Sequence, residues 1–182
     1  MEALISPSRP FVARLDFAAV YDANVDRVWR VISRLGVRAN ELEDAVQDTF
    51  TIAFRSSDEF RGASKVSTWL IGIAVRVAHD YRRRSARKPT EPLEVSITRM
   101  RDSRPGPHEL LELTRAAELL PRLLDQLEPT QRDAFVLIDL EHHTAVEVAE
   151  LTSVPVNTVY SRLRLARTRF NQLVEALNRS PS

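Results

Sequence analysis

The chain has 182 residues, 43% of them hydrophobic, and its 26 Lys and Arg nearly balance its 25 Asp and Glu, for a formal net charge of +1. This length suits one domain or two small ones with a packed core, and the absence of cysteine excludes disulfides and thiolate metal sites. The longest apolar run, Trp69 to Val75, is too short to span a bilayer, and MEALISPSRP lacks the segments of a signal peptide. A cytoplasmic protein without direct membrane insertion is expected.

Proline placement separates a helical first half from the rest of the chain. All ten prolines lie outside residues 11–88, which are therefore free of the strongest helix breaker. Apolar residues recur at helical spacing over residues 17–35, before Gly36, where a helix often ends. A second stripe follows over residues 42–53, and Asn40-Glu41-Leu42-Glu43 predicts a capping box at its start. No alternation typical of strands occurs, so we expect a bundle of about three helices.

The third helix of this bundle is predicted to begin near Ser67, and it belongs to a strongly basic stretch. Between Phe60 and Lys88 the cations are Arg61, Lys65, Arg76, Arg82, Arg83, Arg84, Arg87 and Lys88, against the single acid Asp80. One helical face would carry Trp69, Leu70, Ile73, Ala74, Val77, Ala78 and Tyr81, and the opposite face Thr68, Gly72, Arg76, His79 and Arg83. The apolar face can pack on a core while the other meets an anion; the alternative is an ordinary solvated basic face.

The proline-rich residues 89–108 have no sustained period and read as a linker. Helical pattern resumes over residues 109–127, where Pro121 predicts a kink or two short helices. Glu128-Pro129 is expected to open the next helix, because proline suits the first helical turn.

The C-terminal part predicts a helix-turn-helix. Thr144 to Glu147 is a second capping box before a short helix, and a tight connection over Thr152–Pro155 leads to a long helix from Asn157. That long helix carries Arg162, Arg164, Arg167 and Arg169 with no acid until Glu175. Small polar residues at its N-terminus followed by arginines suit contacts to phosphates and base edges in a major groove. The alternative is a helical hairpin with a solvated basic face.

Together these motifs resemble bacterial RNA polymerase sigma factors of the extracytoplasmic-function (ECF) group. In the first block, Glu43-Asp44-Ala45-Val46-Gln47-Asp48-Thr49-Phe50, Phe60-Arg61-Gly62, Thr68-Trp69-Leu70 and Ile73-Ala74 resemble the family's region 2. In the second, Leu127, Pro129, Gln131-Arg132, Ala145 to Glu150, Thr158 to Leu163 and Ala166-Arg167 resemble region 4. The resemblance implies an all-α chain of two small helical domains: region 2 over 11–88, a linker over 89–112 and region 4 over 113–178.

The resemblance also implies a role for each region. The face formed by Asp44, Gln47, Asp48 and Thr51 would dock on the β′ coiled coil of core polymerase, whose β subunit is a second expected contact; Asp44 also favours its helix N-terminus electrostatically. The melted −10 strand would meet Arg61, Ser64, Lys65, Val66, Trp69, Arg76, His79, Arg83 and Arg84. The −35 duplex would meet Asn157, Thr158, Tyr160, Ser161, Arg162, Arg164 and Arg167.

Two departures from the family pattern affect the −10 loop. Many relatives carry an aromatic residue at Val66 and an asparagine at Arg76, so stacking at Val66 is lost here. Trp69 has two interpretations, core packing or direct strand contact, and Phe60 is expected to anchor the loop.

The remaining expectations concern partners and rival functions. An anti-sigma factor is expected as a partner, and no cofactor, metal or catalytic role is, because nucleophile and phosphate-loop motifs are absent. His142, His143 and Glu147 form only a weak metal pattern, since Glu147 already caps a helix. The rival functions are a dimeric helix-turn-helix regulator and a sigma-like antagonist that sequesters a regulator.

Overall fold

Three helices form the first unit of the computed structural model, which describes residues 16–60, 62, 64–87 and 118–179. They are α1 (Phe17–Arg34), α2 (Leu42–Arg55) and α3 (Val66–Ser85), with short 3-10 turns at Ala39–Glu41 and Ser57–Glu59. The helices pack pairwise on one another, so the expected three-helix bundle is confirmed. The stretch predicted as a linker lies outside the described residues.

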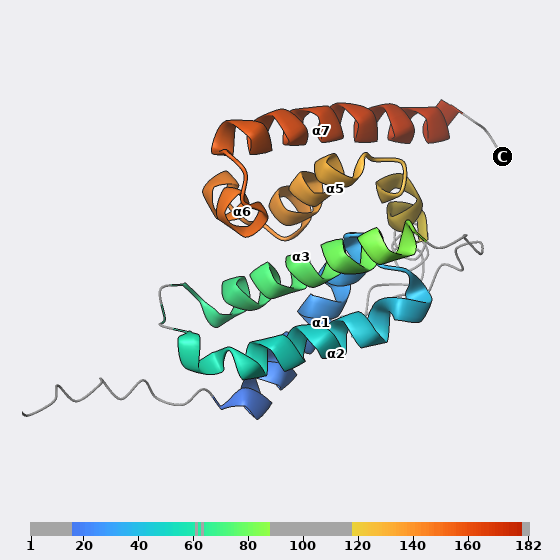
Figure 1. Cartoon of the computed structure of the whole chain (residues 1–182). Coiled ribbons are helices and arrows are strands. Elements are labelled where there is room, and N and C mark those ends of the chain that lie inside the picture. The colour runs from blue at the N-terminus through green and yellow to red at the C-terminus, as the bar shows by residue number, and fades with distance from the viewer. Residues whose placement is uncertain (1–15, 61, 63, 88–117, 180–182) are drawn as a thin grey trace, which may run out of the picture.

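The second unit begins with a helical stretch over residues 118–124. It continues through α5 (Pro129–Phe135), the π-helical turn η3 (Val136–Leu140), α6 (Ala145–Thr152) and α7 (Val156–Arg179). In Figure 1, α7 lies along the top, α5 and α6 lie beneath it, and α3 separates them from α1 and α2. The chain is therefore helical in all its described elements, and α3 is the middle layer. No helix in the described ranges is long and apolar enough to cross a membrane.

Local signals explain most helix ends. Gly36 follows α1 with a φ of +93°, a conformation that L side chains rarely adopt. Glu128 caps α5 by accepting a hydrogen bond from the Thr130 amide, and Pro129 occupies the first turn as predicted. At α6 the Glu147 amide donates to Thr144 Oγ1 (3.2 Å) while the Thr144 amide donates to Glu147 Oε2 (2.8 Å), which confirms the second capping box. The described part of the 118–124 helix runs through Pro121 without ending there.

The capping box predicted at Asn40 is wrong. The residue that precedes α2 is Glu41, which makes no side-chain capping bond and ends a 3-10 turn. Its carboxylate instead accepts a hydrogen bond from Ser85 Oγ at the end of α3 (2.5 Å). Asn40 lies inside the 3-10 turn and not at the N-cap, so it and Glu43 do not form the predicted pair around the first turn of α2.

The core is continuous through both units. Ile32, Leu35, Leu70 and Ile73 are buried in the first, and Leu124, Leu137 and Val148 in the second. On α3 the burial extends beyond the predicted apolar face, because Ile71, Gly72 and Val75 are buried as well. The second unit packs on this side of α3, so the helix is covered on two faces.

Candidate functional site

Helix α7 presents a polar outward face above an apolar inner one. Val159, Leu163 and Ala166 are buried, and Phe170 stacks on Phe135 of α5 with ring centroids 4.7 Å apart. At the start of the helix Asn157 and Ser161 are exposed, Tyr160 is 56% exposed, and Thr158 is half-buried. The connection from α6 turns at Ser153, whose φ is +55°. This short helix, turn and long helix have the geometry of a helix-turn-helix whose second helix can enter a major groove.

The arginines of α7 differ in their partners. Arg167 is bound to Asp139 of η3 through two hydrogen bonds, Nε to Oδ2 (2.9 Å) and Nη2 to Oδ1 (2.6 Å), and this bonding raises the pKa of Arg167. Arg164 is exposed, and Arg162 is half-buried near Glu128, whose pKa is lowered by the hydrogen bond from Thr130 and to a smaller extent by the charge of Arg162. Arg162 and Arg164 are therefore better placed than Arg167 to meet a nucleic acid.

The loop before α3 is anchored by aromatic rings. Phe60 and Trp69 lie with centroids 5.1 Å apart, and Trp69 also packs against the core, so both hold the loop to the bundle. Ser64 and Lys65 are exposed, and Val66 is the first residue of α3. Arg61, also predicted to contact DNA, lies outside the described residues.

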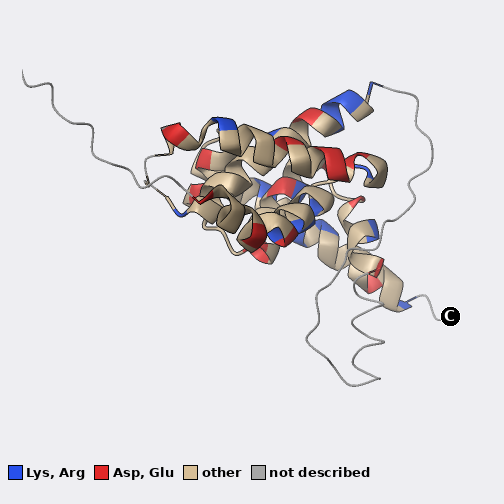
Figure 2. Ribbon diagram, turned by 90° about the horizontal axis from the view of Figure 1, so that it is seen from below, with Lys and Arg blue, Asp and Glu red and all other residues tan. Residues whose placement is uncertain are grey.

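The basic side chains of α3 differ in whether another residue already binds them. Arg76 is exposed, Arg83 is paired with Asp80 (2.5 Å), and the Arg84 guanidinium lies over the Tyr81 ring at 5.4 Å. Seen from below, charges of both signs are interspersed along the helices rather than gathered in one patch (Figure 2). Individual contacts therefore decide which of these cations can bind an anion.

The carboxylate of Asp133 on α5 forms hydrogen bonds with two side chains of α3. Its carboxylate is 2.8 Å from His79 Nε2 and 2.8 Å from Arg82 Nη1. Sequence reasoning named His79 as a DNA contact but did not single out Arg82, which in the sequence looks like its two arginine neighbours. Only the position of Asp133, 51 residues from Arg82, distinguishes it.

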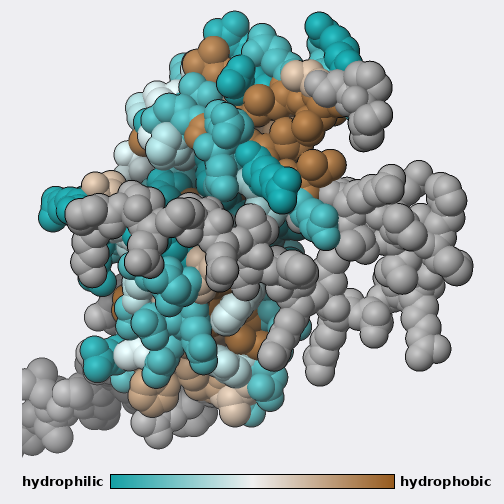
Figure 3. Space-filling view, turned by 90° about the vertical axis from the view of Figure 1, so that its right-hand side faces the viewer, coloured by the Kyte–Doolittle hydropathy of each residue, from teal (hydrophilic) through white to brown (hydrophobic). Residues whose placement is uncertain are grey.

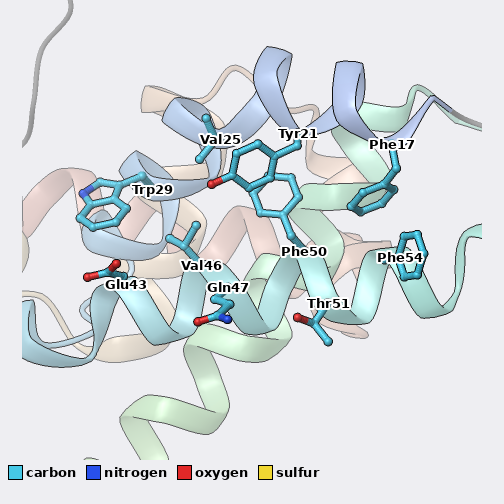
Figure 4. A pocket seen from close by; sticks show the side chains of 10 residues that line it. All are labelled: Phe17, Tyr21, Val25, Trp29, Glu43, Val46, Gln47, Phe50, Thr51 and Phe54. Carbon is cyan, nitrogen blue, oxygen red and sulfur yellow. The ribbon is translucent and has the colours of Figure 1, made fainter.

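The acidic face of α2 borders an open groove between α1 and α2. Asp44, Gln47 and Asp48 are exposed and Thr51 is half-buried. The groove, of about 620 Å³, is lined by Phe17, Tyr21, Val25, Trp29, Glu43, Val46, Gln47, Phe50, Thr51 and Phe54. Figure 4 shows Glu43, Gln47 and Thr51 along its α2 side. Sequence reasoning missed this groove, although Phe54, 62% exposed and outside the predicted stripe, was a possible signal.

Asp48 is tied to α3 through Tyr81. The Tyr81 hydroxyl donates to Asp48 Oδ2 (2.8 Å). Burial and then this hydrogen bond and the charge of Asp48 raise the pKa of Tyr81 to about 12. The contribution of neutral Tyr81 to the free energy of unfolding is therefore fully present below pH 10, the ordinary pKa of tyrosine. It is lost as the pH rises toward 12.

A further set of contacts joins the two units away from α3. Glu141 is 8% exposed and accepts hydrogen bonds from Arg27 Nε (3.2 Å) and Arg34 Nη1 (2.9 Å) of α1. Arg132 is also 8% exposed, and its Nε donates to the Arg34 carbonyl oxygen (2.5 Å). Its Nη1 donates to Asp125 (2.6 Å). These partners span both units and were not predicted.

The weak metal pattern around α6 does not form a ligand set in the described part of the chain. His143 Nδ1 is 3.8 Å from Glu147 Oε2, and burial lowers the pKa of His143. Across the described ranges no group of three or more His, Asp or Glu side chains is arranged to hold a metal ion.

These features define the class: a helical protein with a helix-turn-helix unit and a second bundle that carries a basic helix and an exposed acidic face. The families described as Sigma-70 region 2 and Sigma-70, region 4 match residues 20–88 and 117–170. Curated relatives include the ECF RNA polymerase sigma factor SigM of Mycobacterium tuberculosis, 33% identical over 148 residues, or 81% of this chain and 71% of the relative. The ECF RNA polymerase sigma-E factor of Escherichia coli is 30% identical over 161 residues, with 84% and 83% covered.

A solved structure shares the fold. The sigma factor RpoE of Bartonella quintana, in complex with the anti-sigma factor NepR, has a TM-score of 0.69 at 21% identity, with 88% of this chain and 97% of that chain covered. This chain belongs to the ECF group of RNA polymerase sigma factors, in the sigma-70 family. It is a non-enzymatic factor that directs RNA polymerase to promoters.

Proposed function

We propose that α7 reads the −35 element and α3 with its preceding loop holds the −10 element. The observation that carries this proposal is the outward face at the start of α7, where Asn157, Tyr160, Ser161 and Arg164 are all exposed above a buried apolar face. Such a helix end can approach base edges, while the arginines bind phosphate or guanine. The described residues of the loop supply Ser64 and Lys65 for the backbone of a melted strand.

Core polymerase docks on α2 in this proposal. The acidic positions Asp44 and Asp48, with Gln47 and Thr51, suit a basic helix such as the β′ coiled coil, and the aromatic groove beside them can receive its apolar side chains. A second apolar surface lies beside α7 on the side shown in Figure 3. Leu177 of α7 and Leu119 of the helix over residues 118–124 are exposed. We assign this second surface to the β subunit.

An anti-sigma factor is the partner that would control access to these surfaces. Among solved structures with the same fold, the sigma factor RpoE is in complex with the anti-sigma factor NepR, and CnrH is in complex with the cytosolic domain of CnrY. The exposed aromatic residues Tyr21 and Phe54 offer the kind of surface that a helical inhibitor covers. With core polymerase and promoter DNA as its partners, the chain would act in the cytoplasm.

Run-off transcription tests the assignment directly. The chain is mixed with core polymerase and a genomic promoter library, and transcripts are mapped to their start sites. We expect a small set of starts that share −35 and −10 elements. Transcripts without a shared −35 element would contradict the role of α7, and no transcript under any condition would exclude promoter-directed initiation.

Replacing Arg162 with alanine should weaken promoter binding by about 1–3 kcal/mol if its guanidinium reads a guanine. The loss should be concentrated at one −35 position, which competition with single-base promoter variants measures. Arg169→Ala, the same charge change at an exposed position further along α7, is the matched control and should weaken all sequences alike. An equal loss for every sequence with Arg162→Ala would assign that residue to phosphate.

A further inference from the structure

The face of α3 assigned to DNA is partly occupied by region 4. Thr68, Gly72, Arg76, His79 and Arg83 are the residues of that face. A Cβ on Gly72 would lie 2.9 Å from Leu151 Cδ2 of α6, so the two helices are in close contact there. Seven residues further along α3, His79 is bonded to Asp133 of α5. DNA and region 4 cannot both lie against this strip.

The contact at Asp133 has the chemistry of a phosphate site. His79 Nε2 and Arg82 Nη1 converge on its two carboxylate oxygens, each at 2.8 Å, and Arg82 Nη1 also donates to the Leu35 carbonyl oxygen (2.7 Å). Burial would raise the pKa of Asp133, but the hydrogen bonds from His79 and Arg82 hold it below its ordinary value, so it is an anion at neutral pH. An oxyanion held by an imidazole and a guanidinium is the arrangement these groups would offer to a DNA backbone.

We propose that the packing of region 4 on α3 is an autoinhibitory contact, in which Asp133 occupies the place of a backbone phosphate and region 4 competes with promoter DNA. This inference rests on the proposed function, in which the same face of α3 binds DNA. When core polymerase separates the two regions, His79 and Arg82 are released together. Their binding to DNA phosphate then offsets the free energy needed to separate the regions.

The closed arrangement is suited to being opened. The other ion pairs that join the regions among the described residues, from Arg27 and Arg34 to Glu141, bring together charges whose desolvation largely offsets their attraction. The arginine side chains remain 31% and 29% exposed and can be solvated again when the regions part. Such a contact can restrain the free chain without preventing assembly with a stronger partner.

Two variants separate the regions by different means. Asp133→Asn removes the anion with little change in shape, and Glu150→Gln, the same charge change at an exposed position on α6, is its control. Gly72→Leu leaves every charge in place but inserts a side chain against Leu151, and Leu151→Ala added to it makes room again. Because the chain has no cysteine, Arg55→Cys on α2 and Glu175→Cys on α7 can carry a pair of dyes that reports the separation of the regions.

The readouts are energy transfer between the dyes and affinity for a labelled duplex oligonucleotide of mixed sequence. If the open form is about a tenth of the free wild-type chain, Asp133→Asn and Gly72→Leu should each bind the duplex about tenfold more tightly, with lower energy transfer. Glu150→Gln and the Gly72→Leu/Leu151→Ala double variant should resemble the wild type. An equal gain with Glu150→Gln would reduce the effect to net charge and overturn the inference.

Opened variants whose affinity for the duplex is unchanged would also overturn it. The proposed function fails differently, through absence of transcripts from the wild-type chain with core polymerase. Should Asp133→Asn not fold, as circular dichroism would reveal, the uncharged Gly72 pair decides the question alone.

Discussion

The Asp48→Arg chain is expected to lose binding to core polymerase by at least about 100-fold, while region 4 stays folded. A carboxylate on the exposed face of α2 becomes a cation facing the basic helix proposed as its partner, and such like-charge juxtaposition costs several kcal/mol. The neighbouring aromatic groove cannot make up this loss, because the two helices could no longer approach. Titration of fluorescent core polymerase with each variant measures the change.

Two control variants distinguish an effect on docking from an effect on the structure of the chain. Asp48→Arg also removes the acceptor of the Tyr81 hydroxyl, so Tyr81→Phe, which deletes that hydrogen bond and keeps the carboxylate, should bind core as well as the wild type. Glu150→Arg makes the same charge reversal at an exposed position on α6, a helix that contributes to neither surface assigned to core polymerase, and should also be neutral for core binding. Core binding by Asp48→Arg within twofold of the wild type would remove Asp48 from the docking face.

The Gly36→Ala chain should be less stable by about 2–4 kcal/mol. At a φ of +93° an alanine is strained, which costs about 1–3 kcal/mol. Its Cβ would also lie 2.9 Å from Arg132 Nη1, so the guanidinium would have to leave its bonds to the Arg34 carbonyl oxygen and to Asp125. Urea unfolding followed by circular dichroism gives the difference in the free energy of unfolding.

Gly62→Ala is the matched control for this variant. Gly62 also has a positive φ, +70°, but a Cβ there would meet nothing within 4 Å. We expect a loss of about 1 kcal/mol from backbone strain alone. Because Arg132 belongs to region 4 and Gly36 to region 2, the excess loss at Gly36 measures how firmly the regions are docked. Equal losses at the two glycines would mean that they are not docked in solution.

Signals that act within a few residues could be predicted from the sequence. The capping box at Thr144, the Glu128-Pro129 start of α5 and the glycine after α1 all depend on neighbours along the chain. The same kind of reasoning was wrong at Asn40, because a 3-10 turn over Ala39–Glu41 precedes α2 and places Glu41 at the N-cap. A local pattern states which bonds are possible, and packing decides which are made.

The contacts between the regions could not be predicted, because their partners are far apart in the sequence. Arg27 and Glu141 are 114 residues apart, and Arg82 and Asp133 are 51 apart. Nothing in the sequence distinguishes Arg82 from the arginines that follow it. The exposed face of α2 was predicted from its polar residues, but the groove beside it needed the position of α1, which supplies Phe17 and Trp29.

The close fit of Gly36 around Arg132 has a consequence for the building of hybrid factors. An exchange of region 4 between two members of the family treats regions 2 and 4 as independent units. In this chain such an exchange would also bring a new residue to the place of Arg132 beneath Gly36, and new residues to the places of Glu141 and Leu151. A hybrid would carry a complete helix at the place of α7, which we propose reads the promoter, and would still hold its two halves together differently. The residues at the contact between the regions therefore have to be designed together with the regions themselves.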